Sequence, residues 1–487
     1  MTPKIRRIGT VLLTVVALAV VPLYAQDSSQ VLALSVNYRT LKNTTQLDNQ
    51  LRQELESIER QARAASQSRR YGDAMGHYHH AMALLRGQAW TPARALETAL
   101  QLKTDRVVYD PGDVLRVQIT QIFALENPMT GKLSGSLALN RELKSFAELP
   151  GDFYDRPFMI EAVIPEIVDN TYRMTLTLTP SNGEPIVKSA TIRIARGATA
   201  QAAALKARVA SVAADLKKRD PNGSPSALAA AEYSASMIDL PNAGPDLLEQ
   251  LTRASTILDK ISNGQNPLRT MTGDFRWAYR SLEDNTLQPY RIYVPTNYDP
   301  TKAYPLVVAL HGMGGNENSM FNGYGEGAIK REAETRGYIV VCPKGRGSSS
   351  MYTGTAERDV IDVLKQTMGD YTIDPDRVYL MGHSMGGYGT WSVAMNHPEL
   401  FAALAPIAGG GQTAGLSRIV HIPELIIHGD NDPTVSVEES RKMVRAATEL
   451  GIEVKYVEVP GGDHSGVVVP HLKDVFDWFE SHKRKKR

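Results

Sequence analysis

A serine flanked by glycines, an aspartate and a histidine follow one another along the last third of the chain, in an order suited to nucleophilic catalysis. The serine is Ser384, in the segment Gly382-His-Ser-Met-Gly386. A strand running into this turn and a helix leaving it would project the hydroxyl into a cleft, and flanking glycines let the backbone turn sharply. The five-residue pattern alone is a weak signal, and it gains weight only from its partners.

The expected acid lies in Leu425-Ile-Ile-His-Gly-Asp-Asn-Asp-Pro-Thr-Val435, where an apolar run ends in a loop that carries two aspartates. We favour Asp432, because its spacing from the preceding His-Gly pair matches the acid turn of many α/β hydrolases. Asp430 is the alternative acid. If it is not the acid, its side chain is expected to stabilise the turn.

The expected base is His464, which lies in a glycine-rich loop after a predicted last strand at 455–459. It would take the proton of the Ser384 hydroxyl and return it to the leaving group, while the aspartate holds the ring and stabilises its charged form. The neighbouring Asp463 is interpreted as a loop residue. Nucleophile, acid and histidine thus occur in the order that an α/β-hydrolase sheet requires.

Two backbone amides are candidates for stabilising the oxyanion of an acyl-transfer intermediate. One is the N–H of Met385, directly after the serine. The other is the N–H of Met313 in His311-Gly-Met-Gly-Gly315, which follows a predicted strand at 306–310. Glycines in this segment allow the backbone to approach a substrate oxygen. A plain flexible turn is the alternative interpretation.

Alternating strands and helices must position these residues. Continuous apolar runs are typical of parallel strands buried on both faces; they occur at 306–310, 338–343, 378–381, 404–407 and 425–427. Helices are predicted at 356–368, 387–396 and 437–450, with a final helix ending near Ser481. This βαβ rhythm predicts an α/β fold with an open sheet, an α/β-hydrolase catalytic domain over 267–481.

Other side chains of this region receive supporting roles. His311, His383 and His428 lie inside the motifs and are expected to support them structurally. Tyr388 and Trp391 follow the serine on its helix and would either shape a pocket or pack in the core. Tyr324 lies in a glycine-rich segment and is expected to line the mouth of the site.

The region from Tyr290 to His464 resembles a known group in three segments: Pro289-Tyr-Arg-Ile-Tyr-Val-Pro295, Tyr304-Pro-Leu-Val-Val-Ala-Leu-His-Gly-Met-Gly-Gly315 and Asp376-Arg-Val-Tyr-Leu-Met-Gly-His-Ser-Met-Gly-Gly-Tyr-Gly-Thr-Trp391. They are similar to the secreted esterase and peptidase branch of the prolyl oligopeptidase superfamily. Polyhydroxybutyrate depolymerase-like and feruloyl esterase-like enzymes are close relations in motif.

This resemblance implies serine-dependent hydrolysis of a carboxylic ester, or less often of a peptide bond, without a metal or organic cofactor. By matching position it carries over Ser384, Asp432, His464 and the amides of Met313 and Met385. The front half does not resemble the β-propeller of true prolyl oligopeptidases, so a peptidase is the second hypothesis. A non-catalytic binding protein with a silent hydrolase domain is the third.

The front half divides by its periodicity. Helical spacing and then period-two alternation predict three regions: a helical region over 26–101, an immunoglobulin-like β-sandwich over 102–197, and a helical hairpin with linker over 198–266. The hairpin is expected to pack on the N-terminal helices. His77, His79 and His80 fall on a predicted helix; a solvated helix face is favoured there over a metal site, because no carboxylate accompanies them at a recognised spacing.

The two ends of the chain carry short special segments. Basic residues before an apolar run at 8–21 predict a signal peptide over 1–25, cleaved after Ala25, which implies a secreted or periplasmic protein. An uncleaved anchor is the alternative. The basic tail over 482–487 is interpreted as a solvated terminus. The single cysteine, Cys342, excludes an intramolecular disulfide and is expected to pack in a buried strand.

Composition limits the partners. Lys and Arg total 54 against 53 for Asp and Glu, so the net charge of +1 gives no global attraction to nucleic acid or to anionic membranes. We therefore expect a small-molecule or polymer-linked ester substrate, possible polysaccharide contact by the front domains, no nucleic acid, and no stable membrane span after signal removal. At 487 residues the chain is long enough for two or three domains.

Overall fold

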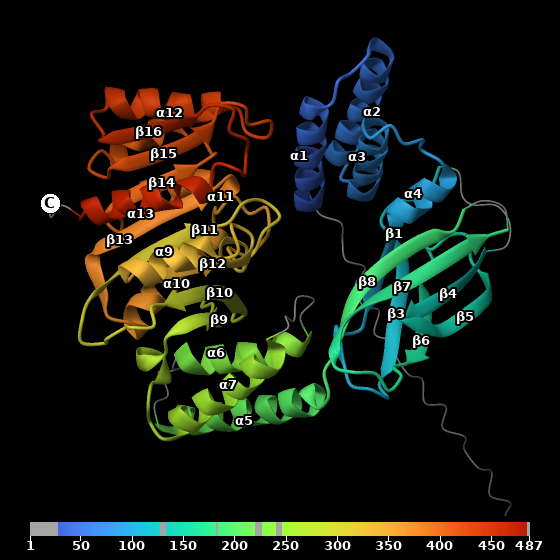
Figure 1. The fold of residues 1–487 in the computed structure, drawn as a ribbon, viewed down its shortest axis with the longest axis horizontal. Coiled ribbons are helices and arrows are strands. Elements are labelled where there is room, and N and C mark those ends of the chain that lie inside the picture. Colours follow the sequence, from blue (N-terminus) through green and yellow to red (C-terminus); the bar gives the residue numbers. More distant parts are fainter. Residues whose placement is uncertain (1–27, 127–132, 182–183, 220–225, 240–245, 485–487) are drawn as a thin grey trace, which may run out of the picture.

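The computed structural model describes residues 28–126, 133–181, 184–219, 226–239 and 246–484. The predicted signal peptide and its cleavage site therefore lie outside the described residues. The described part begins with a bundle of three helices, α1 (Ser28–Thr44), α2 (Asn49–Gln67) and α3 (Tyr71–Leu85), followed by α4 (Pro92–Ala99) (Figure 1). The apolar side chains that repeat along α2 are buried in this bundle. The first strand begins at Leu100, so the helical region ends just before its predicted boundary.

Two sheets follow and share one core. The first has the order β1 (Leu100–Thr104), β3 (Val114–Gln121), β6 (Phe158–Val163). The second has the order β2 (Val108–Tyr109), β8 (Ile186–Ile194), β7 (Asn170–Pro180), β4 (Leu133–Leu139), β5 (Arg141–Leu149). Leu115 and Val117 of one sheet are buried in the same cluster as Met174 and Leu176 of the other, as period-two alternation requires. The β2–β8 pair is parallel, whereas the other strand pairs of these two sheets are antiparallel.

Three helices, and not the predicted hairpin of two, connect this part to the catalytic sheet: α5 (Ala198–Arg219), α6 (Ser226–Ser236) and α7 (Leu247–Ser262). They also pack in a different place from the one expected. Their buried faces share a core with Phe275 and Trp277 of the catalytic sheet, and not with the N-terminal helices. The helices thus cover one side of the catalytic domain (Figure 1).

The predicted catalytic domain, residues 267–481, is built on one eight-stranded sheet. Its spatial order is β16 (Val454–Val459), β15 (Glu424–Gly429), β14 (Ala403–Ile407), β13 (Ile373–His383), β11 (Tyr304–Leu310), β12 (Ile339–Pro343), β10 (Leu287–Val294), β9 (Gly273–Arg280). The six strands from β11 to β16 pair in parallel, and β9 and β10 add an antiparallel edge. A sheet of this kind brings the loops at its carboxyl edge together.

Helices cover both faces of this sheet (Figure 1). Helices α10 (Thr355–Asp370), α11 (Met385–Asn396) and α12 (Val437–Glu449) share a core with one face. Helices α9 (Ala328–Arg336) and α13 (Leu472–Ser481) share a core with the other face, and the short α8 (Ser319–Asn322) adds Met320 and Phe321 to it. Cys342 of β12 is fully buried in this second core, as expected, and burial raises the pKa of its thiol.

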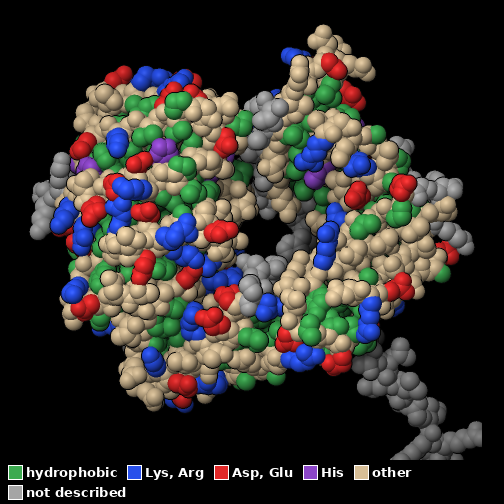
Figure 2. Space-filling model, in the orientation of Figure 1, with side chains coloured by type: hydrophobic (Ala, Val, Ile, Leu, Met, Phe, Trp, Pro, Cys, Tyr) green, Lys and Arg blue, Asp and Glu red, His purple; other side chains and the backbone are tan. Residues whose placement is uncertain are grey.

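The surface agrees with the balanced composition, since Figure 2 shows basic and acidic side chains interspersed over one face of the molecule. At the C-terminus, the Arg484 guanidinium lies 3.1 Å from a carboxylate oxygen of Asp376. The described part of the basic tail is therefore partly docked, and not simply solvated as predicted. No helix within the described ranges has both the length and the apolar character that a membrane span needs.

Candidate active site

Ser384 occupies a strained turn between a strand and a helix. Strand β13 ends at His383, helix α11 begins at Met385, and Ser384 between them has φ 57° and ψ −118°. The crossing is close: a Cβ added to Gly386 would lie 2.2 Å from the carbonyl oxygen of Leu310. Only glycine allows that approach, so the local sequence specifies a turn that projects the serine side chain.

The three residues predicted to act together lie within hydrogen-bond distance of one another. The Ser384 hydroxyl is 2.8 Å from Nε2 of His464. Nδ1 of the same ring is 2.7 Å from Oδ2 of Asp432. The residues lie after β13, β15 and β16, which run parallel, and the loops therefore meet at one edge of the sheet. With Nδ1–H donating to the carboxylate, Nε2 is free to accept the serine proton.

The carboxylate of Asp432 is fully buried and heavily hydrogen-bonded. Its Oδ1 accepts the backbone N–H groups of Thr434 and Val435 at 2.7 and 2.9 Å. Its Oδ2 lies 3.2 Å from Nε2 of His428, in addition to the contact with His464. Burial alone would raise the pKa of Asp432, but the hydrogen bonds from the two imidazoles outweigh burial and hold the pKa well below its ordinary value. The group is therefore ionised at neutral pH.

The neighbouring aspartates hold backbone, not the histidine ring. Oδ1 of Asp430 accepts the N–H of Gly461 at 2.7 Å, which ties the acid loop to the histidine loop. Oδ1 of Asp463 accepts the N–H of Ser465 at 3.0 Å. Of the two candidate acids, the structure therefore brings Asp432, and not Asp430, to the ring of His464.

The loop after β11 lies directly beside the serine. A Cβ added to Gly312 would be 3.5 Å from the Cβ of Ser384. The N–H of Gly314 donates to the carbonyl of Ser348 at 2.7 Å, which holds this loop to the segment after β12. Within the described part of the chain the amide of Met313 donates no hydrogen bond. The amide of Met385 begins α11 and has no partner inside the helix. Both amides are thus available to an oxyanion.

A second histidine supports the catalytic loops from behind. Nε2 of His383 donates to the carbonyl of His464 at 2.7 Å, and Nδ1 lies 2.7 Å from the hydroxyl of Tyr324. Burial, reinforced by the nearby His464, lowers the pKa of His383 to about 4, so the ring is neutral at pH 7. Tyr324 was expected at the mouth of the site. Its side chain is partly exposed, and its hydroxyl is hydrogen-bonded to the His383 ring.

The other residues singled out in the sequence take structural or separate places. Trp391 is fully buried and its indole N–H donates to Glu424, so it belongs to the core. His77, His79 and His80 are half-buried, and not on a solvated helix face, because α3 packs beside α4 and the segment after β3. In the described ranges no group of three or more metal-ligating side chains is present.

Comparisons with known proteins find similarity to esterases. A family model described as PET hydrolase-like (PETase) matches residues 342–472, which include all three candidate catalytic side chains. A probable feruloyl esterase C of Aspergillus flavus is 32% identical over 186 residues, covering 37% of this chain and 68% of that protein. A bifunctional acetylxylan esterase/xylanase of Neocallimastix patriciarum is 30% identical over 153 residues, covering 30% of this chain and 22% of that protein. A thermostable esterase of solved structure aligns over 79% of this chain and all of its own, with a TM-score of 0.40 and 20% identity.

Proposed function

We propose, because the chain belongs to the α/β-hydrolase serine esterase family, that it cleaves carboxylic esters through an acyl-serine intermediate on Ser384. The observation that carries the proposal is the hydrogen-bonded series from Asp432 through His464 to Ser384, with separations of 2.7 and 2.8 Å. Each member has the chemical type that its role requires: a hydroxyl, an imidazole and a buried carboxylate.

The reaction proceeds in two half-steps. Nε2 of His464 takes the proton of Ser384 as the serine oxygen attacks the ester carbonyl. The tetrahedral oxyanion is stabilised by the N–H groups of Met313 and Met385, and the imidazolium by Asp432. Collapse of the intermediate expels the alcohol, which receives the proton from His464. Water then gives a proton to the same ring and attacks the acyl carbonyl. As the second tetrahedral intermediate collapses and releases the acid, His464 returns the proton to the Ser384 oxygen.

The type of ester that is cleaved and the cellular location of the enzyme are two finer proposals. The similarity to a probable feruloyl esterase and to an acetylxylan esterase/xylanase favours acyl groups carried on a plant polysaccharide. A substrate of this kind requires a secreted or periplasmic enzyme, which the predicted signal peptide over 1–25 would supply. The front regions are then the natural contact with polysaccharide, with the β-sandwich as an immunoglobulin-like module between them and the catalytic domain.

The proposal is tested with a fluorophosphonate probe and two substrate panels. We expect the probe to label the wild type and not Ser384→Ala, and we expect the variant to lose several orders of magnitude in ester turnover, because triad members act as a unit. Labelling that survives in Ser384→Ala would overturn the assignment of the nucleophile. Strong turnover of chromogenic peptides without p-nitrophenyl ester turnover would favour a peptidase. A protein that reacts with neither the probe nor the two substrate panels would favour a silent hydrolase domain.

A further inference from the structure

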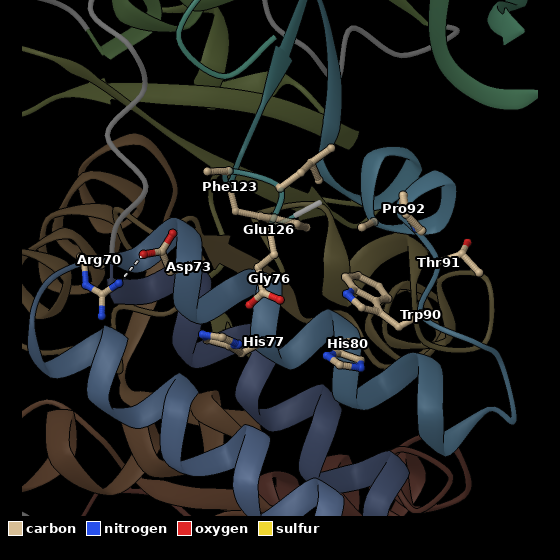
Figure 3. Close-up of a pocket in the computed structure, with 13 residues that line it drawn as sticks. Arg70, Asp73, Gly76, His77, His80, Trp90, Thr91, Pro92, Phe123 and Glu126 are labelled. Carbon is tan, nitrogen blue, oxygen red and sulfur yellow. Dashed lines mark hydrogen bonds and ion pairs between the residues drawn. The ribbon is translucent and has the colours of Figure 1, made fainter. Parts of the chain in front are cut away.

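A cavity of about 320 Å³ lies in the front half, between helix α3, the loop that precedes α4 and the segment that follows β3 (Figure 3). Its walls are held together by a close contact, since a Cβ added to Gly76 of α3 would lie only 3.0 Å from the ring of Phe123. The volume is at the lower end of the range of small-molecule sites. The cavity is made entirely of residues outside the catalytic domain.

Three polar side chains in this cavity are free to bind a ligand. Among the residues that the structure describes, the imidazoles of His77 and His80 and the carboxylate of Glu126 make no hydrogen bond, whereas Arg70 and Asp73 at the rim pair with each other at 2.6 Å. Figure 3 shows the Glu126 carboxylate over α3, between His77 and Trp90. Unused donors and acceptors that converge on one space are what a polar ligand needs.

An aromatic surface completes the cavity. The indole of Trp90 is half-buried and stacks on the His80 ring, with centroids 5.0 Å apart and planes at 13°. This stack holds the tryptophan in one orientation before any ligand arrives. A flat indole bordered by hydrogen-bonding groups fits a sugar ring, which has an apolar C–H face and hydroxyls around its rim.

The charge of the cavity selects among ligand classes. Burial lowers the pKa of both His77 and His80 in spite of the nearby Glu126, so both rings are neutral at pH 7. The ion pair at the rim cancels, which leaves the carboxylate of Glu126 as the uncompensated charge of the lining. An anionic ligand would be repelled, and no three-residue metal site is present in the described ranges. Neutral imidazoles that offer both donors and acceptors suit a ligand rich in hydroxyls.

We propose that this cavity binds a short stretch of a neutral glycan chain, with Trp90 against a sugar face and with His77, His80 and Glu126 hydrogen-bonded to its hydroxyls. The cavity is then the site of the polysaccharide contact proposed above. Only the class of partner, a polysaccharide, rests on the proposed function. Binding in the cavity does not depend on the chemistry at Ser384.

Binding is tested by titration calorimetry with xylohexaose, using full-length Ser384→Ala protein so that no turnover occurs. We expect saturable binding that Trp90→Ala weakens at least about tenfold and that Trp90→Phe keeps within about threefold. Glu126→Gln should also keep binding within about threefold, because an amide still bonds to hydroxyls. Trp478→Phe in α13 is the matched control and should bind like its parent. Circular dichroism melting confirms that each variant is folded.

Charged probes separate the remaining classes. Hexagalacturonate, which is anionic, should bind much more weakly than xylohexaose. A glucosamine hexamer, which is cationic, should bind with no higher affinity than xylohexaose. Absence of heat with xylohexaose at millimolar concentration, or equal affinity in folded Trp90→Ala, would overturn the proposal. Preferred binding of the cationic hexamer that Glu126→Gln abolishes would replace the neutral glycan by a cation. Since binding is measured without turnover, a failed nucleophile assignment leaves this result intact.

Discussion

His428 lies at the end of β15 and connects three parts of the site. Its Nε2–H is shared between the carbonyl oxygen of Val435 at 3.0 Å and Oδ2 of Asp432 at 3.2 Å, and its Nδ1 lies 2.7 Å from the hydroxyl of Ser440 in α12. The ring is fully buried, so it cannot exchange these partners for water. It therefore fixes the position of the carboxylate that in turn orients His464, and we interpret it as a positioning residue.

Removing this ring should slow catalysis without weakening substrate binding. We expect His428→Ala to lower kcat about tenfold with KM nearly unchanged, because one hydrogen bond to a charged group is worth about 1.4 kcal/mol or more. His428→Gln should recover part of the rate. Steady-state kinetics on a p-nitrophenyl ester measure both, and His421→Ala, whose ring bonds the carbonyl of Pro398, is the control. An unchanged kcat in His428→Ala would exclude the positioning role.

At the scale of single residues, the sequence predicts which residues form the site better than it predicts which groups their side chains contact. Ser384, Asp432 and His464 could be singled out because each lies in a motif with a fixed local spacing. The supporting role of His383 and His428 was also expected. Their partners could not be predicted, because the Tyr324 hydroxyl that meets His383 comes from a loop far away in the chain, and no periodicity encodes that meeting.

The turn at Ser384 between β13 and α11, called the elbow below, is the element on which the site depends most. Gly386→Ala should strongly destabilise the protein, because the new methyl group would meet the backbone of Leu310 at 2.2 Å and backbone must move. We expect a loss of about 3 kcal/mol or more in the free energy of unfolding. Urea unfolding followed by circular dichroism measures it.

The matched control is Gly369→Ala in α10, where an added Cβ has nothing within 4 Å. Alanine is the better helix former, so this variant should be neutral or gain about 0.5–1 kcal/mol. Equal stability of the two variants would show that the close approach at the elbow is not required for folding.

The helix that carries the serine is also tied to the sheet by a buried carboxyl group. Oε2 of Glu424 in β15 accepts the indole N–H of Trp391 at 3.0 Å, and Oε1 has no partner among the described residues. Burial raises the pKa of Glu424 from 4.5 to about 7, with the Trp391 hydrogen bond opposing it. The folded state therefore holds a proton that the unfolded chain releases between these two values.

Stability should fall as the pH rises from about 4.5 to about 7, because the unfolded state binds fewer protons in this window. A shift of this size corresponds to about 3 kcal/mol. Glu424→Gln keeps the acceptor for Trp391 and cannot ionise, so it should match the wild type at pH 4.5 and exceed it by up to that amount at pH 8. Urea unfolding at both pH values tests this. A difference in the free energy of unfolding between the two proteins that is the same at pH 4.5 and at pH 8 would contradict this prediction.

Helices with apolar residues along one face could be predicted, whereas a helix whose residues are mostly buried could not. The helices at 356–368 and 437–450 are present with small shifts in their ends. Helix α6, with the sequence Ser-Ala-Leu-Ala-Ala-Ala-Glu-Tyr-Ser-Ala-Ser, was missed because most of its residues are buried and it shows no amphipathic stripe. A hairpin of two helices was therefore predicted where three exist.

At the scale of the whole molecule, one core joins the sandwich, the connecting helices and the catalytic sheet, whereas the N-terminal helices have a core of their own. One cluster contains Val108 of the sandwich, α5 to α7, and Trp277 of the catalytic sheet. The catalytic domain is therefore not complete at the predicted boundary of residue 267, because α6 and α7 cover apolar side chains of β9. The sequence could not show this, since the distance in the chain between α6 and its partner strands hides the contact.

Two truncated chains test this interdependence. Residues 198–487 keep the helices and should remain soluble and labelled by the fluorophosphonate probe. Residues 268–487 expose Phe275, Trp277 and their neighbours to water and should aggregate or lose labelling. Soluble yield and probe labelling measure both chains. A shorter chain that is as soluble and as reactive as the longer one would show that the helices are dispensable.

Cys342 gives the molecule a built-in reporter of its own opening. It is the single thiol in 487 residues and lies fully buried in β12, near the middle of the catalytic sheet. A thiol-reactive dye attacks only the thiolate, and burial raises the pKa of this thiol. Each dye molecule attached therefore marks one chain in which the core between the sheet and the helices α8, α9 and α13 has opened. The labelling rate under native conditions counts these events without any engineered tag.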